Sequence, residues 1–420
     1  MMDSLTRRLF EELCRIRLID PHSHIVPTSP ASTSLVDLLG YHYFTELAHS
    51  AGLAKDRIVE SRDEDLVELL LTHLEGVTNT IQYSWLVEIA RTFLDYDDPV
   101  ISPRDARLLF ERSIQKMSDP NWTEHVFHAT NLDAIFLTND FDDPLEGFDS
   151  ALYVPCLRTD DLVFKLDDPH VQNRWRKATG VEPTRMEEGL SVLFKRFTQK
   201  GARACAISVP PDFSPVRPSP AKALMALHAL QQGSLDRSLR EQASHAIFFA
   251  IADQCEAFEL PFDLMIGVRR GVYSNGVYQG QDLFDQRTSL DQYRALFNDK
   301  PRVMFPISVL THMQNQELAS FAWIFPNVVT CGHWWYANIP AYIEADTRAR
   351  LEAVPASKQI GYYSDAYKLE FVLPKFNMYR RSLARVLAND FVLARGWSEE
   401  RSLQLGRQIL RGNVERIFRV

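Results

Sequence analysis

The sequence contains few cysteines, and their spacing argues against two common uses of this residue. The five are odd in number, widely scattered and never arranged as Cys-x-x-Cys: Cys14, Cys156, Cys205, Cys255 and Cys331. A disulfide framework needs an even set in a small chain, and a zinc ribbon needs paired Cys-x-x-Cys motifs. We therefore expect neither, and we expect the protein to work in a reducing compartment.

Long apolar runs and an excess of basic residues are also missing. The apolar run 246–252 is much shorter than the roughly 20 residues that span a bilayer, and residues 1–10 are polar and charged, unlike a signal peptide. With 46 basic and 55 acidic residues the formal net charge is -9, which offers no positive surface for a polyanion. These absences predict a cytoplasmic protein that binds neither membranes nor nucleic acids.

The sequence does contain a repeated alternation of short strands and helices. Its 420 residues, 45% of them hydrophobic, can bury a large core. Apolar segments rich in β-formers predict eight strands, at 17–20, 132–138, 151–157, 203–209, 262–267, 302–308, 327–331 and 359–364. Helical periodicity predicts helices between or after them, at 184–200, 221–230, 243–258, 290–297, 316–325 and 378–391. This alternation favours an α/β fold of the (β/α)8 TIM-like barrel class over a doubly wound sheet, and no Gly-x-Gly-x-x-Gly or Walker motif is present.

One segment, residues 32–130, does not follow the alternation. It shows helical periodicity at 35–50, 64–75, 85–93 and 104–117, with no convincing strand. A connection of this length needs structure of its own and commonly forms a lid or a binding insertion. We expect a barrel domain made of residues 1–31 and 131–420, with 32–130 as a helical subdomain inserted after strand one.

Two histidines at the end of the first expected strand form half of a metal site. In the extended segment Asp20-Pro21-His22-Ser23-His24, alternate side chains share a face, so both imidazoles can reach one ion. Asp365 ends the eighth strand, which neighbours the first in a closed barrel. Taken alone, the aspartate is more simply interpreted as a helix cap and the histidines as loop residues. Together they predict a site for a catalytic divalent ion, with zinc as the first candidate and manganese as the alternative.

Other strand ends carry residues suited to recognition. Arg158 follows strand three and Arg270 follows strand five, while His333, Trp334 and Trp335 follow strand seven. Arginine pairs geometrically with carboxylates, and paired tryptophans can form the floor of a sugar pocket. The alternative is that these arginines are surface residues and the tryptophans anchor a loop.

These and further motifs resemble those of a known family, the uronate isomerases, which are the glucuronate isomerase branch of the amidohydrolase superfamily. The resemblance begins with Asp20-Pro21-His22-Ser23-His24 and Tyr41-His42-Tyr43, and continues through 137–144, 154–160, 266–270, 332–338, 364–365, 379–381 and 409–418. It covers most of the chain, in short motifs.

The resemblance implies a reaction and a set of site residues. It implies aldose–ketose isomerisation of a hexuronate or related sugar acid through an ene-diol, by a protein that forms a homo-oligomer. One divalent ion would be held by His22, His24 and Asp365, and Asp365, Tyr43 and His42 would be catalytic. The residues implied in substrate binding are Arg158, Arg270, His333, Trp334, Trp335, Tyr367 and Lys368.

Departures from the family pattern leave the substrate open. Tyr367 stands where the family has an arginine, Met265 where it has a strand-five histidine, and Ala206 and Ile207 where it has an Asp-His pair. Two other hypotheses therefore stay open. One is a mononuclear metal-dependent hydrolase or decarboxylase of the same superfamily, favoured by His312 and His333 as further histidines. The other is a barrel that binds a sugar acid without turnover.

Overall fold

The structure, a computed structural model, describes residues 3–273, 275, 277–278 and 281–420. All eight expected strands form, six of them inside the expected range, while β5 and β10 each extend one residue beyond it. They are β1 (Leu18–Asp20), β2 (Leu132–Phe136), β4 with β5 (Tyr153–Val154 and Cys156–Arg158), β6 (Ala204–Val209), β7 (Phe262–Ile266), β10 (Phe305–Val309), β11 (Val328–Cys331) and β12 (Gln359–Ile360). Every pairing among them is parallel.

The pairing order follows the chain order, as a barrel requires. One barrel sheet has the order β1-β2-β4, and the other runs β12-β11-β10-β7-β6-β5-β3, where β3 (Asn139–Asp140) comes directly after β2. A third sheet, antiparallel and two-stranded, pairs β8 (Val268–Arg269) with β9 (Leu283–Phe284). Strands one and eight meet just past their carboxyl ends, where the Asp365 amide donates to the His22 carbonyl over 3.1 Å and the His24 amide donates to the Ala366 carbonyl over 2.8 Å. These bonds bring the first and last strands together, and the barrel class is confirmed.

Alternation along each strand divides the core in two. On β6, Ala204 and Ala206 belong to the cluster inside the barrel, whereas Cys205 and Ile207 belong to the cluster that packs against the surrounding helices. Because both faces of a barrel strand are covered, the strands appear in the sequence as nearly continuous apolar runs.

The helices that cover the barrel include all those expected, with shifted ends. They are α11 (Met186–Gln199), α12 (Pro220–Gln231), α13 (Arg237–Ala257), α14 (Arg294–Asp299), α15 (Asn315–Ile324) and α17 (Val372–Val386), the last continued by a π-helical segment Leu387–Leu393. Helices that the periodicity did not predict are α1 (Ser4–Cys14), α9 (Asp160–Phe164), α10 (Pro169–Thr179), α16 (Pro340–Ala353) and α18 (Glu399–Arg407). The C-terminal segment, which was singled out only by resemblance, ends in α19 (Asn413–Phe418).

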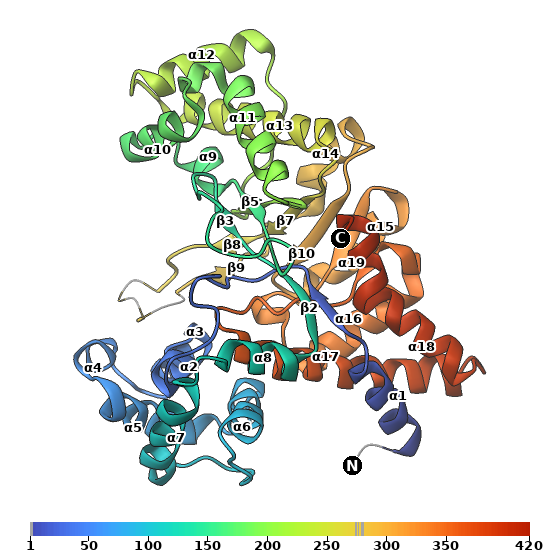
Figure 1. Ribbon diagram of the computed structural model, residues 1–420. Helices are drawn as coiled ribbons and strands as arrows, with labels where there is room; N and C mark the ends of the chain where they lie inside the picture. The colour runs from blue at the N-terminus through green and yellow to red at the C-terminus, as the bar shows by residue number, and fades with distance from the viewer. Residues whose placement is uncertain (1–2, 274, 276, 279–280) are drawn as a thin grey trace.

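Residues 32–130, all of which the structure describes, contain helices and no strand, as expected. The helices are α2 (Leu35–Leu39), α3 (His42–Ser50), α4 (Lys55–Glu60), α5 (Asp63–Leu74), α6 (Ile81–Phe93), α7 (Ala106–Met117) and α8 (Trp122–Thr130). In Figure 1 helices α2–α7 gather on one side of the strands, and α10–α13 lie on the opposite side. One hydrophobic cluster joins the inserted helices to α17, so the insertion packs directly against the barrel. The exact division into two domains stays a prediction.

Within the described part of the chain, no helix is both long and apolar enough to cross a membrane.

Candidate metal centre and active-site cavity

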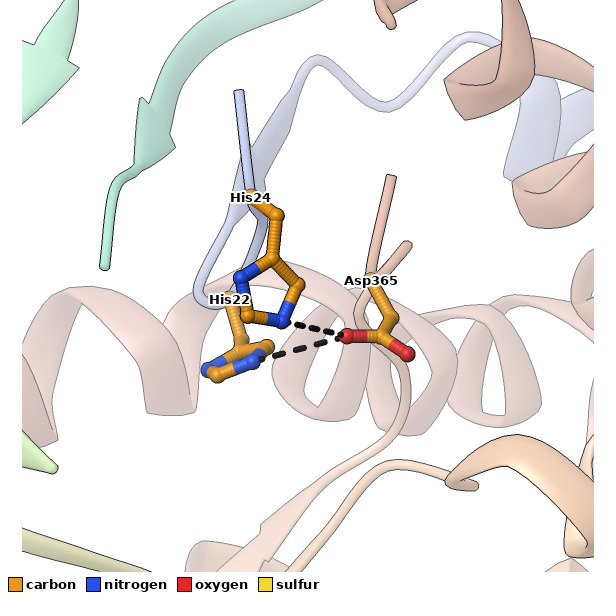
Figure 2. Close-up of side chains that lie close together, drawn as sticks. All are labelled: His22, His24 and Asp365. Carbon is orange, nitrogen blue, oxygen red and sulfur yellow. Dashed lines mark ion pairs between the residues drawn. The ribbon is translucent and has the colours of Figure 1, made fainter. Parts of the chain in front are cut away.

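His22, His24 and Asp365 meet where strands one and eight come together. His24 Nε2 lies 3.3 Å from Asp365 Oδ1, and His22 Nε2 lies 3.6 Å from the same oxygen. Figure 2 shows both Nε2 atoms facing that oxygen, while the second carboxylate oxygen points away. Among the described residues, these three form the one group of histidine, cysteine or acidic side chains arranged to hold a metal ion.

The geometry of the three side chains fits a metal ion. Tetrahedral bonds of about 2.0–2.2 Å place ligand atoms about 3.3–3.6 Å apart, which matches the two distances. His22 Nε2 and Asp365 Oδ1 are buried and have no hydrogen-bond partner in the described part of the protein, which is costly unless an ion binds them. Two imidazoles and one carboxylate suit zinc or manganese.

The charges of the centre are coupled. Burial alone would raise the pKa of Asp365, but the two imidazoles hold this pKa well below its usual value. Burial lowers the pKa of His24, which favours the neutral form that binds metals. Asp365 is therefore an anionic ligand rather than a protonated buried acid.

The backbone at Asp365 is strained and is held by two other elements. Its φ of 52° lies in the left-handed region. The Tyr41 hydroxyl, just before α3, donates to the Asp365 carbonyl over 2.9 Å. From α17, Lys375 Nζ donates to that hydroxyl over 2.8 Å and to the Ser364 carbonyl over 2.7 Å. Lys375 is fully buried, and burial lowers its pKa to about 8.

A carboxylate that the sequence reasoning missed lies beneath the centre. Asp263 on β7 is buried inside the barrel, and its Oδ2 lies 3.7 Å from His22 Nδ1. Burial raises the pKa of Asp263 to about 6, and His22 opposes this shift. The one signal for it was an acidic residue inside the otherwise apolar strand Phe262–Ile266.

A cavity of about 570 Å³ opens next to the centre. It is lined by most of the residues that the sequence and the resemblance indicated, namely His22, His24, His42, Arg158, Arg270, Trp334, Trp335, Asp365, Tyr367 and Lys368. Tyr41, Asp160 and Asp282 also line it, although none of them was among the predicted site residues. The structure therefore gathers the predicted residues from five strand ends and from the insertion.

Two expected site residues do not line this cavity in the described part of the protein. Tyr43 is buried in the core of the insertion, where its ring lies 5.6 Å from that of Trp85. The reason is that α3 begins at His42, so consecutive side chains point about 100° apart and only His42 faces the cavity. His333 is also buried, with Nε2 3.4 Å from the Thr347 hydroxyl, because the chain turns at Gly332 and presents the following tryptophans instead.

The cationic residues on the cavity already have partners. Arg158 Nε lies 3.2 Å from Asp160 Oδ2, and Arg270 Nη1 lies 2.6 Å from Asp282 Oδ2. Lys368 Nζ donates to the Ser29 carbonyl over 2.9 Å. The positive charge of both arginines is therefore balanced locally by an aspartate.

Aromatic rings surround the histidine on the cavity wall. His42 lies 4.6 Å from the Tyr41 ring and 5.3 Å from the Trp335 ring, measured between ring centroids. Burial lowers its pKa to about 3, so His42 is neutral at physiological pH. Tyr367 stacks on His24 at 4.8 Å, which places a neutral phenol beside the centre.

Comparison with known proteins identifies the fold. No family model matches the sequence, and no curated protein matches it significantly. Among solved structures, a uronate isomerase from Thermotoga maritima superimposes with a TM-score of 0.90 at 17% identity, over 100% of this chain and 98% of that one. The chain has the fold of the uronate isomerases. A glucuronate isomerase from Caulobacter crescentus gives a TM-score of 0.89 at 16% identity, covering 100% of this chain and 95% of that one. A uronate isomerase from Bacillus halodurans gives 0.80 at 22% identity, covering 100% of this chain and 97% of that one. The uronate isomerase fold implied by the sequence motifs is thus confirmed over the whole chain.

Proposed function

We propose that this protein is a metal-dependent isomerase that interconverts the aldose and ketose forms of a hexuronate or related sugar acid. The observation that carries the proposal is the group His22, His24 and Asp365 at the edge of a cavity, in a chain whose full length superimposes on uronate isomerases. Zinc is the first candidate for the ion and manganese the second, because the donor set suits both.

The reaction requires a proton to move between two neighbouring carbons. A base removes the proton from the carbon next to the carbonyl, and the same proton or one from solvent is returned to the former carbonyl carbon. A bound divalent ion would supply positive charge beside the two oxygens of the ene-diol.

Two groups on the cavity can accept that proton. The outer oxygen of Asp365 points away from the imidazoles and the side chain is ionised, so it can take the proton from carbon. His42 is neutral on the cavity wall, so it can exchange the proton of a substrate hydroxyl. Tyr43, whose catalytic role was an expectation from resemblance, does not line the cavity among the described residues, but its ring contacts His42 and Tyr41, which do.

The remaining cavity residues suit a sugar acid. Arg158 and Arg270 can hold a substrate carboxylate or hydroxyls while keeping Asp160 and Asp282 as partners, because guanidinium has five donors. Trp334 and Trp335 offer apolar surface for the carbon chain, and Tyr367 and Lys368 complete the rim. Homo-oligomerisation and a cytoplasmic location stay predictions.

The second hypothesis, a hydrolase or decarboxylase, relied on a further histidine. His312 Nδ1 hydrogen-bonds to Asp346, and His333 is buried beside the same aspartate. Neither lines the cavity in the described part of the chain. The feature that favoured this hypothesis is therefore not at the metal centre, and isomerisation is the better-supported reaction.

The proposal is tested by metal analysis together with an assay on hexuronates in deuterated water. We expect about one ion per chain. We also expect isomerisation with solvent deuterium incorporated at the carbon that receives the proton. Asp365→Ala should lose the ion and lower kcat/KM by about 10³-fold or more, since the lost electrostatic stabilisation is several kcal/mol. Asp160→Asn, a cavity carboxylate outside the metal group, should keep the ion.

Three outcomes would contradict the proposal. An active Asp365→Ala protein would refute the assigned centre. Hydrolysed or decarboxylated product without isomerisation would favour the second hypothesis. Tight binding of sugar acids without any exchange or turnover would favour a non-catalytic barrel.

A further inference from the structure

The interior of the barrel holds a carboxylate whose position is unexplained by packing. On β7, Phe262 and Leu264 face the surrounding helices, whereas Asp263 and Met265 face inward. Met265 lines the cavity, so Asp263 lies one layer deeper. Its Oδ1 has no hydrogen-bond partner among the described residues, and such orphaned buried groups call for an explanation.

Among the described residues, the one ion pair of Asp263 is with a proposed metal ligand. Its Oδ2 lies 3.7 Å from His22 Nδ1, while His22 Nε2 lies 3.6 Å from Asp365 Oδ1. The two nitrogens of one imidazole therefore face two different carboxylates. A shift of about half an ångström brings the Nδ1 contact into hydrogen-bond range, at about 3.2 Å or less.

The second histidine has an equivalent arrangement. Thr138 Oγ1 donates its only proton to the Ser23 carbonyl over 2.8 Å, so at its 2.9 Å contact with His24 Nδ1 it must accept. His24 thus carries its proton on Nδ1 and keeps Nε2 free. A threonine hydroxyl selects this tautomer for His24, and a carboxylate occupies the corresponding place beside His22.

We infer that Asp263 is a positioning residue of the metal centre, which accepts a hydrogen bond from Nδ1–H of His22 and thereby holds its Nε2 lone pair toward the ion. This inference rests on the metal site of the proposed function, but it does not depend on which reaction the protein catalyses. Such carboxylate–histidine–metal arrangements orient the ring and raise the basicity of the ligand nitrogen.

The inference predicts opposite effects on stability and on metal binding. Without the ion, a buried carboxylate with one imperfect partner costs free energy, so replacing it with an apolar residue of similar size should leave the metal-free protein equally or more stable. The same replacement should weaken metal binding. A residue that only supported the fold would show a loss of stability instead.

The test compares the wild type with Asp263→Leu and Asp263→Asn. Zinc affinity is measured by competition with a chromophoric chelator, and the stability of the metal-free protein by urea unfolding. Asp263→Leu should bind zinc about 10–100-fold more weakly with unchanged or higher stability. Asp263→Asn keeps an acceptor oxygen but loses the charge, so its zinc affinity should lie between that of the wild type and that of Asp263→Leu. Cys156→Ala, which changes an inward-facing residue of the hydrophobic cluster inside the barrel, should bind zinc as the wild type does.

The outcomes separate this inference from the proposed function. If the wild type binds no zinc, the metal site and the role of Asp263 fall together. If the wild type binds zinc and both Asp263 variants bind it within about twofold, the metal site stands and the inference is overturned. The inference is also overturned if Asp263→Asn keeps its zinc affinity while Asp263→Leu fails to fold, because Asp263 is then only structural.

Discussion

Gly332 shows how one residue shapes the edge of the cavity. It follows β11 with φ 52°, and a Cβ built there would lie 2.3 Å from the Tyr363 ring. That ring packs 5.2 Å from His22. The glycine is therefore required both by the left-handed turn and by the close approach of an aromatic neighbour of the metal centre.

This position yields a prediction with an internal control. Gly332→Ala should destabilise the protein by about 2–5 kcal/mol. About 1–3 kcal/mol of this comes from the clash with Tyr363, and about 1–2 kcal/mol comes from the left-handed backbone. Gly233 has φ 67° and open space around the added Cβ, so Gly233→Ala should cost only the backbone part, about 1–2 kcal/mol. Urea unfolding of both metal-free variants measures the difference, and equal losses would show that Tyr363 moves aside freely.

At the scale of elements, the inserted helices and α17 hold the end of strand eight. Tyr41 and Lys375 donate to the backbone carbonyls of Asp365 and Ser364, which keeps the left-handed turn that aims the Asp365 side chain. Both groups therefore act on the backbone of this turn. The insertion therefore contributes to the geometry of the centre as well as to the wall of the cavity.

Removing the Tyr41 hydroxyl or the Lys375 ammonium group should weaken the metal centre. Lys375→Met should cost about 1.5–3 kcal/mol, because the Ser364 carbonyl and the Tyr41 hydroxyl lose a charged donor. A double-mutant cycle of Lys375→Met and Tyr41→Phe, measured on the free energy of unfolding, should give a coupling energy of about 0.5–3 kcal/mol. Both variants should also bind zinc more weakly in the chelator competition.

Lys358 offers a matched control for this prediction. Its Nζ likewise donates to backbone carbonyls, those of Ala322 and Phe325, but at the end of α15. Lys358→Met should therefore destabilise the protein without changing zinc affinity. Equal zinc affinity in the Lys375 and Lys358 variants would remove the proposed link between α17 and the metal centre.

At the scale of the whole molecule, the barrel is closed at its amino-terminal end by the last helix. Val414, Ile417 and Phe418 belong to the same interior cluster as the inward-facing strand residues. The Phe418 ring lies 5.0 Å from that of Phe136, and the Asn413 side chain donates to the Ala356 and Gln359 carbonyls. The end of the chain thus fills the interior beneath the centre.

This closure predicts a variant that separates stability from binding. Phe418→Ala should destabilise the protein by about 3–5 kcal/mol, as expected for a buried phenylalanine with little room to collapse. Zinc affinity should stay within about twofold, since the perturbation is at the other end of the barrel. Val420→Ala, at an exposed residue, should leave urea unfolding unchanged. A large loss of zinc affinity in Phe418→Ala would show that the two ends are coupled.

The sequence by itself determined the eight strands of the barrel and many of the helices, and it indicated the three proposed ligands. Barrel strands face an apolar interior on one side and apolar helices on the other, so they appear as short apolar runs that can be counted. His22 and His24 are separated by the two-residue period of an extended chain, and Asp365 ends the last of the eight runs. These features are local or follow from the order of the strands, which is why they could be read in advance.

Only the tertiary structure decided which neighbouring side chains serve the centre. Whether His42 or Tyr43 faces the cavity depends on where α3 begins and how it packs, and the burial of His333 depends on the turn at Gly332. Asp263 and Lys375 lie more than 100 positions from His22 and from Tyr41, their respective partners. Periodicity describes the backbone of one segment at a time, whereas these contacts exist only because closing the barrel brings distant segments together.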